Sequence, residues 1–201
     1  MKLRNEIEGI VGSTYRHALF YNFPGGLRFE LSEGTSPLDQ ALSALRKATV
    51  VCEDIFAGEA RMLVHLMTPA PESLFALRFM IRQLRIAGVI FPKMREFWLD
   101  EDKETDEEPF CFVNCAFEVA AHKLQNLLWC AITPDLGLRP RPGCLIYLLN
   151  PAKGIVVHPY DDRGLDVIGR NASSLAGLYE RHNHLLLDFD MTAMRQAFAS
   201  S

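Results

Sequence analysis

The hydrophobic and polar positions along the first half of the chain switch between two periods. Residues 27–31 alternate between apolar and charged side chains, which predicts a half-buried strand. Apolar residues at helical spacing over residues 37–57 follow Ser36, a favourable N-cap, and predict a helix. A strand over residues 60–67 and an amphipathic helix over residues 72–88 follow. The first half therefore reads as strand, helix, strand, helix, behind a loosely patterned N-terminal segment.

The second half of the chain is richer in strand patterns. Residues 95–100 and 109–119 predict two strands on either side of the acidic loop 100–108, and a helix follows. Three short apolar runs within residues 144–169, joined by tight turns, predict a meander. Further helices, with Asn171 and Asp190 as expected caps, complete the chain. This order predicts an α+β fold: a mainly antiparallel sheet with helices packed on it, and a C-terminal three-stranded meander followed by helices.

The chain length bears on domain organisation. A chain of 201 residues is long enough to bury one core without metals or disulfides, so we expect a single α+β domain over residues 1–201. The acidic loop near the middle leaves open a division into two lobes, residues 1–99 and 109–201.

Composition and charge narrow the class of protein. The formal net charge of −4 argues against a nucleic-acid partner, which favours a basic surface. The sequence contains no apolar run of membrane-spanning length and does not begin with a signal-peptide pattern, so no membrane partner is expected. The five cysteines are an odd number within apolar runs, as is typical of free, buried thiols. We therefore expect a cytoplasmic protein.

Three motif-like features carry no expected chemistry. Cys111 and Cys115 lie four positions apart on a predicted strand, about 13 Å apart, too far for both sulfurs to bind one zinc ion. The adjacent letters His-Asn-His at residues 182–184 point in different directions on a helix, and we interpret them as a surface helix end. Gly25 and Gly26 precede a strand rather than a helix, so they do not form a phosphate loop. No metal and no cofactor is predicted.

A basic stripe on the second amphipathic helix is the first candidate site. Arg78, Arg82 and Arg85 are spaced to share one helix face, beside Phe75 and Phe79. The stripe could bind an acidic partner, or it could pair with acids of the same chain, including the loop 100–108.

The second candidate site is the stretch HPYDDRGLDVIG, residues 158–169. The turn between two predicted strands lies at residues 161–164, where Gly164 is expected to supply a left-handed residue. The remaining polar residues exceed what a turn requires, and we consider four candidate catalytic residues: Asp161, Asp162, Arg163 and Asp166.

Three interpretations of this hairpin stay open. Arg163 could clamp the hairpin by bridging to Asp166, Glu30 or Glu180. Tyr160, on the same stretch, could contact a partner. The carboxylates could also perform acid–base or divalent-metal chemistry, although the spacing of a calcium loop is absent.

These sequences carry a resemblance. The segment YDDRGLDVI, the segment LYERHNHLLLDFD near the C-terminus and GGLRFELS near the N-terminus resemble the signatures of a bacterial domain family of unknown function. The resemblance covers roughly residues 20–198 and implies a bacterial α+β protein without an established activity. This chain has His184 where such families often have tryptophan.

The sequence supports one preferred class of function and two alternatives. We expect a protein–protein interaction module, of the immunity or antitoxin kind, because the surface features are charged and no catalytic constellation is recognisable. The first alternative is an enzyme at the hairpin, with His158 and Tyr160 beside the carboxylates. The second is a small-molecule binding module with a pocket between sheet and helix. The oligomeric state is left open.

Overall fold

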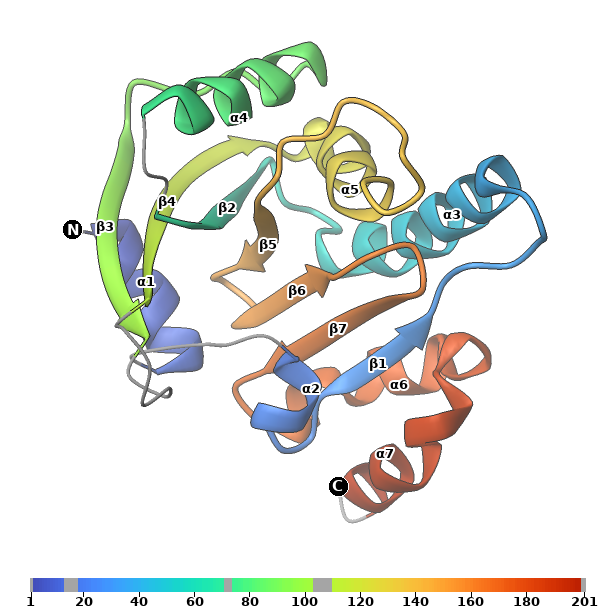
Figure 1. The fold of residues 1–201 in the computed structure, drawn as a ribbon. Helices are drawn as coiled ribbons and strands as arrows, with labels where there is room; N and C mark the ends of the chain where they lie inside the picture. Colours follow the sequence, from blue (N-terminus) through green and yellow to red (C-terminus); the bar gives the residue numbers. More distant parts are fainter. Residues whose placement is uncertain (1, 13–17, 71–73, 103–109, 200–201) are drawn as a thin grey trace.

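A seven-stranded sheet organises the molecule (Figure 1). The computed structural model describes residues 2–12, 18–70, 74–102 and 110–199. Every strand pairing is antiparallel, and the strand order is β1-β7-β6-β5-β2-β4-β3. The strands are β1 (Leu27–Glu30), β2 (Arg61–Pro69), β3 (Arg95–Asp102), β4 (Phe110–Ala120), β5 (Leu145–Asn150), β6 (Ile155–Pro159) and β7 (Gly164–Gly169). The predicted antiparallel α+β fold and its C-terminal meander, β5-β6-β7, are confirmed.

Helices precede, separate and follow the strands. They are α1 (Lys2–Val11), α2 (Leu19–Asn22), α3 (Pro37–Ile55), α4 (Leu74–Ile86), α5 (Leu124–Ile132), α6 (Ala176–Arg181) and α7 (Met191–Phe198). The predicted cap of α3 is confirmed, because Ser36 Oγ accepts the N–H of Asp39 at 3.1 Å. None of the helices in the described part of the chain is long and apolar enough to cross a membrane.

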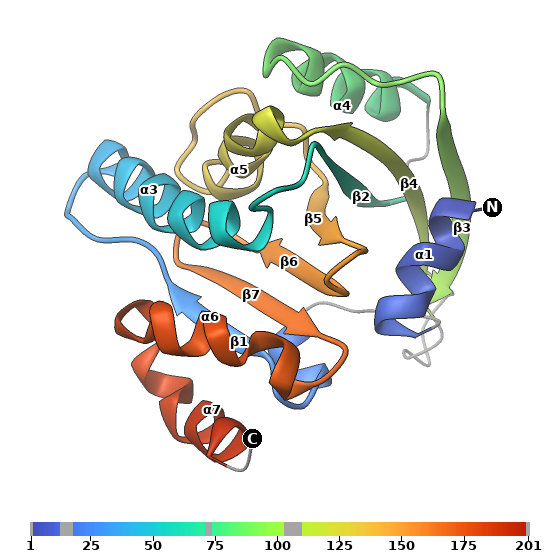
Figure 2. The same cartoon turned by 180° about the vertical axis from the view of Figure 1, so that it is seen from behind.

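The two faces of the sheet bury different sets of side chains. The larger apolar cluster joins the sheet to α3, α4, α5 and α6, and includes Phe29, Phe117 and Leu127. The smaller cluster lies on the opposite face, where Ile7 of α1 and Leu19 of α2 pack on the strands. Figures 1 and 2 show the helices around the sheet from the front and from behind. Burial of apolar surface on both faces is the main force that holds the layers together.

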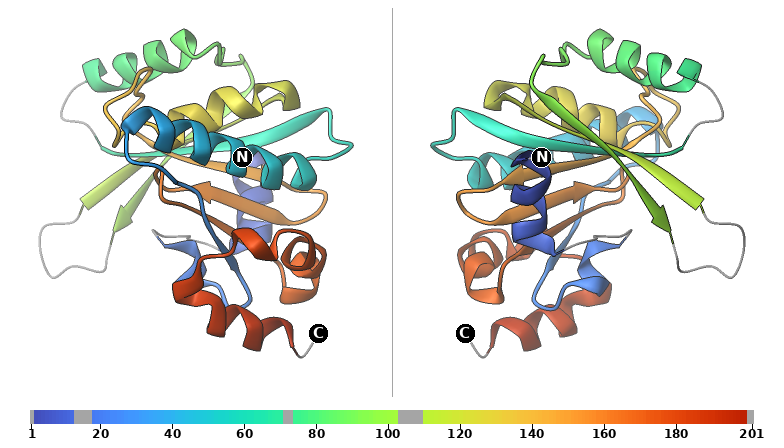
Figure 3. Two further views of the ribbon diagram at one scale, coloured as in Figure 1. Left: turned by 90° about the vertical axis from the view of Figure 1, so that its right-hand side faces the viewer. Right: turned by 90° about the vertical axis from the view of Figure 1, so that its left-hand side faces the viewer.

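The two edges of the sheet also differ. At the β1 edge, Leu187 donates its N–H to the carbonyl of Arg28 at 2.9 Å, and Phe29 forms a β-bridge with Leu186. At the other edge, β3 pairs with β4 alone among the described residues, and the ribbon of the two strands projects from the body in Figure 3. One edge is therefore covered by the chain's own C-terminal segment, whereas no described segment pairs with the outer side of β3.

Candidate functional site

In the turn of the β6–β7 hairpin, the charged side chains of Asp161 and Arg163 bind each other. Asp161 accepts the backbone N–H of Arg163 at 2.7 Å and the Nε–H of the same arginine at 2.8 Å. The Nη2 atom of Arg163 also donates to the Asp161 carboxylate. Asp161 is 5% exposed, whereas the Arg163 side chain is 75% exposed, so the pair sits at the boundary with solvent. The bonds to Asp161 raise the pKa of Arg163.

Gly164 is required for a reason that the sequence did not reveal. The expected left-handed conformation is wrong, because Gly164 is absent from the residues with positive φ. The Tyr160 ring instead folds back onto Gly164, so that a Cβ atom at this position would overlap the tyrosine hydroxyl. Burial raises the pKa of Tyr160 to about 12. The candidate binding residue Tyr160 therefore packs inside the hairpin.

Asp162 is the second carboxylate of the turn and is also buried, at 7% exposure. Burial and the neighbouring Asp161 charge together raise its pKa above the ordinary value. Both carboxylates of the turn are therefore buried, although turn residues usually lie at the surface. Ionisation of Asp162 in the folded protein is therefore unfavourable in free energy.

Asp166 belongs to a buried ion pair with Arg28 of β1. Arg28 Nε donates to Asp166 Oδ1 at 2.7 Å, and its Nη2 donates to Oδ2 at 3.1 Å. Asp166 is fully buried and also accepts the backbone N–H of Phe20 at 3.1 Å. Burial alone would lower the pKa of Arg28, but the hydrogen bonds and the charge of Asp166 raise it above its ordinary value. The internal clamp exists, but its predicted arginine was wrong: Arg28, and not Arg163, bridges to Asp166.

Aromatic rings and a second carboxylate complete the surroundings of Arg28. Its guanidinium carbon lies 4.5 Å from the ring centre of Tyr21 and 5.3 Å from that of Tyr160. Arg28 Nη1 is 3.4 Å from Asp190 Oδ2, and the Tyr21 hydroxyl donates to the same carboxylate at 3.3 Å. Asp190 was expected to cap the last helix, but its side chain makes no capping hydrogen bond. It ties that helix to α2 and β1 instead.

A row of stacked rings crosses the same face of the sheet. His65 stacks on Trp98 and on Tyr147, with ring centres 5.1 Å and 5.5 Å away, and Tyr147 stacks on His158 at 4.3 Å. Asn114 Oδ1 lies 2.9 Å from His65 Nε2. Burial lowers the pKa of His65 to about 4, so this ring is neutral near pH 7. The row is part of the packing between strands, and the candidate residue His158 lies within it.

The C-terminus of α3 gathers another charged cluster. Asp54 Oδ2 accepts from Arg181 Nε at 2.7 Å and lies 2.9 Å from His182 Nε2. Burial alone would raise the pKa of Asp54, but the bonds from these two residues hold it below its ordinary value. Lys153 Nζ donates to the carbonyl of Ile55 at 2.8 Å, at the helix end. His182 is buried at 7% exposure, so the predicted surface position of this histidine was wrong.

No metal-binding cluster is formed by the histidine, cysteine and acidic side chains that the structure describes. Cys111 and Cys115 lie on β4, as predicted, and the cysteines are free thiols. Burial raises the pKa of Cys115 and of Cys130 to about 12, so both thiols stay protonated and unreactive near pH 7.

The basic stripe on α4 presents a different situation. Arg78, Arg82 and Arg85 are all exposed, and none of them forms an ion pair with a carboxylate in the described part of the chain. Beside them, Phe75 and Phe79 are 76% and 47% exposed. Charge and large apolar area therefore share one exposed face of α4. Residues 103–108 of the acidic loop, the expected pairing partner within the chain, lie outside the described residues.

The proline-rich connector between α5 and β5 extends this surface. Arg141 donates its backbone N–H to the buried Oε1 of Gln83 in α4 at 3.1 Å, and Trp129 Nε1 donates to the carbonyl of Arg139 at 3.1 Å. A groove of about 230 Å³ separates α4 from the connector and is lined mainly by Thr68, Phe75, Phe79, Met80, Pro142 and Gly143. The connector is thus fixed against α4 and α5 with its two arginines exposed.

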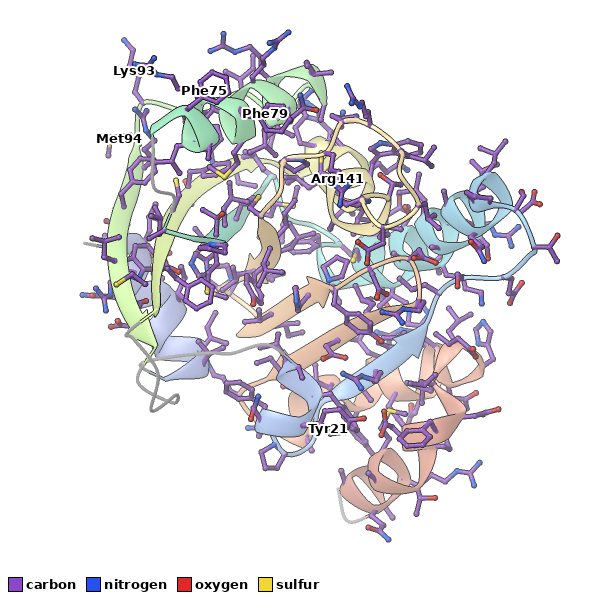
Figure 4. All side chains as sticks on the ribbon, viewed as in Figure 1. Tyr21, Phe75, Phe79, Lys93, Met94 and Arg141 are labelled. Carbon is purple, nitrogen blue, oxygen red and sulfur yellow. The ribbon has the colours of Figure 1, made fainter. Side chains whose placement is uncertain are left out.

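We call this region the α4 surface. Its exposed residues are Phe75, Arg78, Phe79, Arg82 and Arg85 of α4, Lys93 and Met94 before β3, and Arg139 and Arg141 of the connector. Figure 4 shows the labelled members at the α4 end of the molecule, away from Tyr21. The sequence analysis missed Lys93, Met94 and the connector arginines. A count of charged residues along the sequence could have indicated part of the α4 surface, because residues 74–99 contain five basic residues and one acid.

Comparisons with known proteins place the chain in a family. A comparison with curated proteins finds no match, and neither does one with solved structures. A family model matches residues 3–190, which is most of the chain. The chain therefore belongs to the family described as domain of unknown function (DUF3885).

Proposed function

We propose that this chain is a protein-interaction module that binds an acidic, partly apolar segment of another protein at the α4 surface. The observation that carries the proposal is the combination, on one helix, of exposed phenylalanines and of exposed arginines that form no ion pair within the described part of the chain. Arginine and aromatic side chains are enriched among the residues that dominate binding energy in protein interfaces. The surface offers both, around a shallow groove.

The electrostatics favour an acidic partner. Arg78, Arg82 and Arg85 lie on a chain whose formal net charge is −4, so the α4 surface is a basic region on an acidic protein. A guanidinium group can bind a carboxylate through two parallel hydrogen bonds, which gives orientation as well as attraction. The adjacent Phe75 and Phe79 would cover apolar side chains of the same segment and remove both sets of rings from water.

The hairpin supports catalysis less well than the α4 surface supports binding. Asp161 and Asp166 each hold an arginine of the same chain, and Tyr160 is packed on Gly164. Groups engaged in this way would have to break internal bonds before they reached a substrate. The described groove beside α4 is lined mainly by apolar side chains, which suits an anchoring side chain of a protein better than a polar small molecule.

The narrower form of the proposal is a neutralising partner in the bacterial cytoplasm, of the immunity or antitoxin kind. A reducing compartment suits the free cysteines. In this form, the acidic segment would belong to a toxic protein that the module occupies.

Affinity capture from the native host tests the proposal. The tagged wild-type chain is expected to retain one specific protein, and Arg82→Glu is expected to reduce that retention at least tenfold. Arg195→Glu is the matched control, because Arg195 is an exposed arginine on α7, distant from α4, and its variant should retain the protein. Retention should also fall as the NaCl concentration rises, because exposed charges are screened by salt.

Two results would contradict the proposal. If Arg82→Glu and Arg195→Glu retain the same protein equally well, the partner does not use the α4 surface. If the captured material disappears after nuclease treatment, the basic surface serves nucleic acid and the proposed partner class is wrong.

A further inference from the structure

The β3 edge, with which no second strand pairs in the described part of the chain, presents apolar side chains on the face that carries the main core. Phe97 and Leu99 are 49% and 66% exposed, and in the register with β4 they lie opposite Cys115 and Val113. Cys115 belongs to the main apolar cluster, so the two exposed residues extend its face beyond the helices. A strand edge with free backbone groups and an apolar face is suited to pairing with another strand.

The residue order of β3 is complementary to itself. We propose that β3 of two copies of this chain pair antiparallel about Trp98 and join two sheets into one. In this register, Phe97 of each copy lies opposite Leu99 of the other, so both exposed apolar side chains are covered. In the backbone register, position 95 lies opposite position 101 of the second copy.

The backbone accepts this register whichever residues point outward. Pairing about Trp98 sets odd-numbered residues against odd-numbered residues, and even against even. Outward N–H groups therefore meet outward carbonyls of the other copy, as antiparallel pairing requires. A shift by two residues would keep only one apolar pair, Phe97 opposite Phe97 or Leu99 opposite Leu99, in place of the two Phe97–Leu99 pairs.

The opposite face of β3 tolerates the pairing because its acids already have donors. The register sets Glu96 opposite Asp100 of the second copy. Glu96 accepts the backbone N–H groups of Leu3 and Arg4 at 3.1 Å each. Asp100 accepts from Trp98 Nε1 at 2.8 Å and lies 3.4 Å from Arg4 Nη2. The arginine and the N-terminal end of α1 offset the negative charge on this face.

This inference stands apart from the proposed function. The α4 surface lies beside the start of β3 (Figure 4), and antiparallel pairing brings that start to the far end of the partner strand. The α4 helix and the connector arginines of both copies would remain accessible in the dimer, although Met94 would lie opposite position 102 of the second copy. A dimer can therefore exist whether or not an acidic partner binds, and each idea can fail alone.

Sedimentation of the purified full chain tests the dimer. We expect a species of twice 22.7 kDa at micromolar concentration, and at least tenfold weaker association for Leu99→Lys. Leu42→Lys is the matched control, because Leu42 is a similarly exposed leucine on α3, at 54%, and its variant should dimerise normally. Circular dichroism of both variants confirms that each is folded.

Oxidative cross-linking tests the register. In a Cys111→Ser/Cys115→Ala background, which removes the thiol opposite position 97 within the chain, the double variant Phe97→Cys/Leu99→Cys should form a disulfide-linked dimer, because position 97 faces position 99 of the other copy. Either single cysteine should cross-link at least tenfold less. A chain that stays monomeric at all concentrations, or a dimer that Leu99→Lys leaves intact, overturns the proposal. Efficient cross-linking of a single cysteine variant overturns the register.

Discussion

At the β1 edge, Arg28 is buried between Asp166, Asp190 and three aromatic rings, and the segment around Leu187 covers the strand. At the opposite end, and within the described residues, Arg82 of α4 is exposed without an ion pair and β3 has no strand on its outer side. The same residue type is thus committed to the fold at one end and left to solvent at the other.

The difference follows from burial. A charge that leaves water without a partner costs several kcal/mol, and the buried Arg28 accordingly lies between two carboxylates, Asp166 and Asp190. An exposed guanidinium carries no such cost, and natural selection for stability does not require a partner for Arg82. Free charge beside free apolar area is therefore more informative about binding than the conspicuous but internally paired charges of the hairpin.

The largest expected effect on stability comes from removing the buried Arg28 at the β1 edge. Arg28→Ala leaves Asp166 buried without its ion-pair partner, which should lower the free energy of unfolding by about 3–5 kcal/mol. Arg82→Ala should change it by no more than about 0.5 kcal/mol. Urea denaturation of both variants measures the two values. Equal effects would show that the contrast between the two ends is wrong.

An intermediate effect is expected from Gly164→Ala. The added methyl group meets the Tyr160 hydroxyl, and such overpacking should cost about 1–3 kcal/mol in thermal or urea unfolding. In a Tyr160→Ala background the same substitution should cost much less, because the ring is gone. Gly9→Ala is the control, since Gly9 lies in α1 with no atom near the new methyl, and the variant should be slightly stabilised. A Gly164→Ala cost that persists without the ring would contradict this role.

The smallest effect concerns Asp162 and pH. Because its folded-state pKa is raised, the folded protein binds the proton more tightly than the unfolded chain does, and stability falls as pH rises through the window above about 4. Asp162→Asn removes this fall. The variant should therefore gain stability relative to wild type between pH 3 and pH 7, by less than about 1 kcal/mol. Unfolding curves at several pH values measure it, and a difference independent of pH would refute it.

The sequence predicted the elements of this fold well because periodicity is a local property. The alternation at residues 27–31 and the cap at Ser36 each depend on a few neighbours, and both appear in β1 and α3. The strand order could not be read in the same way. It depends on which strands share apolar area across the whole chain, and β1 meets β7 only in the folded protein.

The candidate sites show the same limit. Arg28 and Asp166 are 138 residues apart, and no spacing in the sequence links them. The reason for Gly164 required the position of the Tyr160 ring, which a turn rule does not contain. The stripe on α4 could be predicted because it lies on one helix, whereas Arg141 reaches that surface only through the hydrogen bond to Gln83.

The pairing of β1 with β7 has a consequence for how the protein is made. The chain leaves the ribosome from its N-terminus at about 5–20 residues per second, so Asp166 follows Arg28 by roughly 7–28 s. Through that interval β1 has no strand to join, while β2, β3 and β4 can already form their ribbon. Leu27 and Phe29 are fully buried in the folded protein, but during this interval they belong to a strand that has not yet paired. The N-terminal strand is among the first parts to be synthesised and among the last to reach its place.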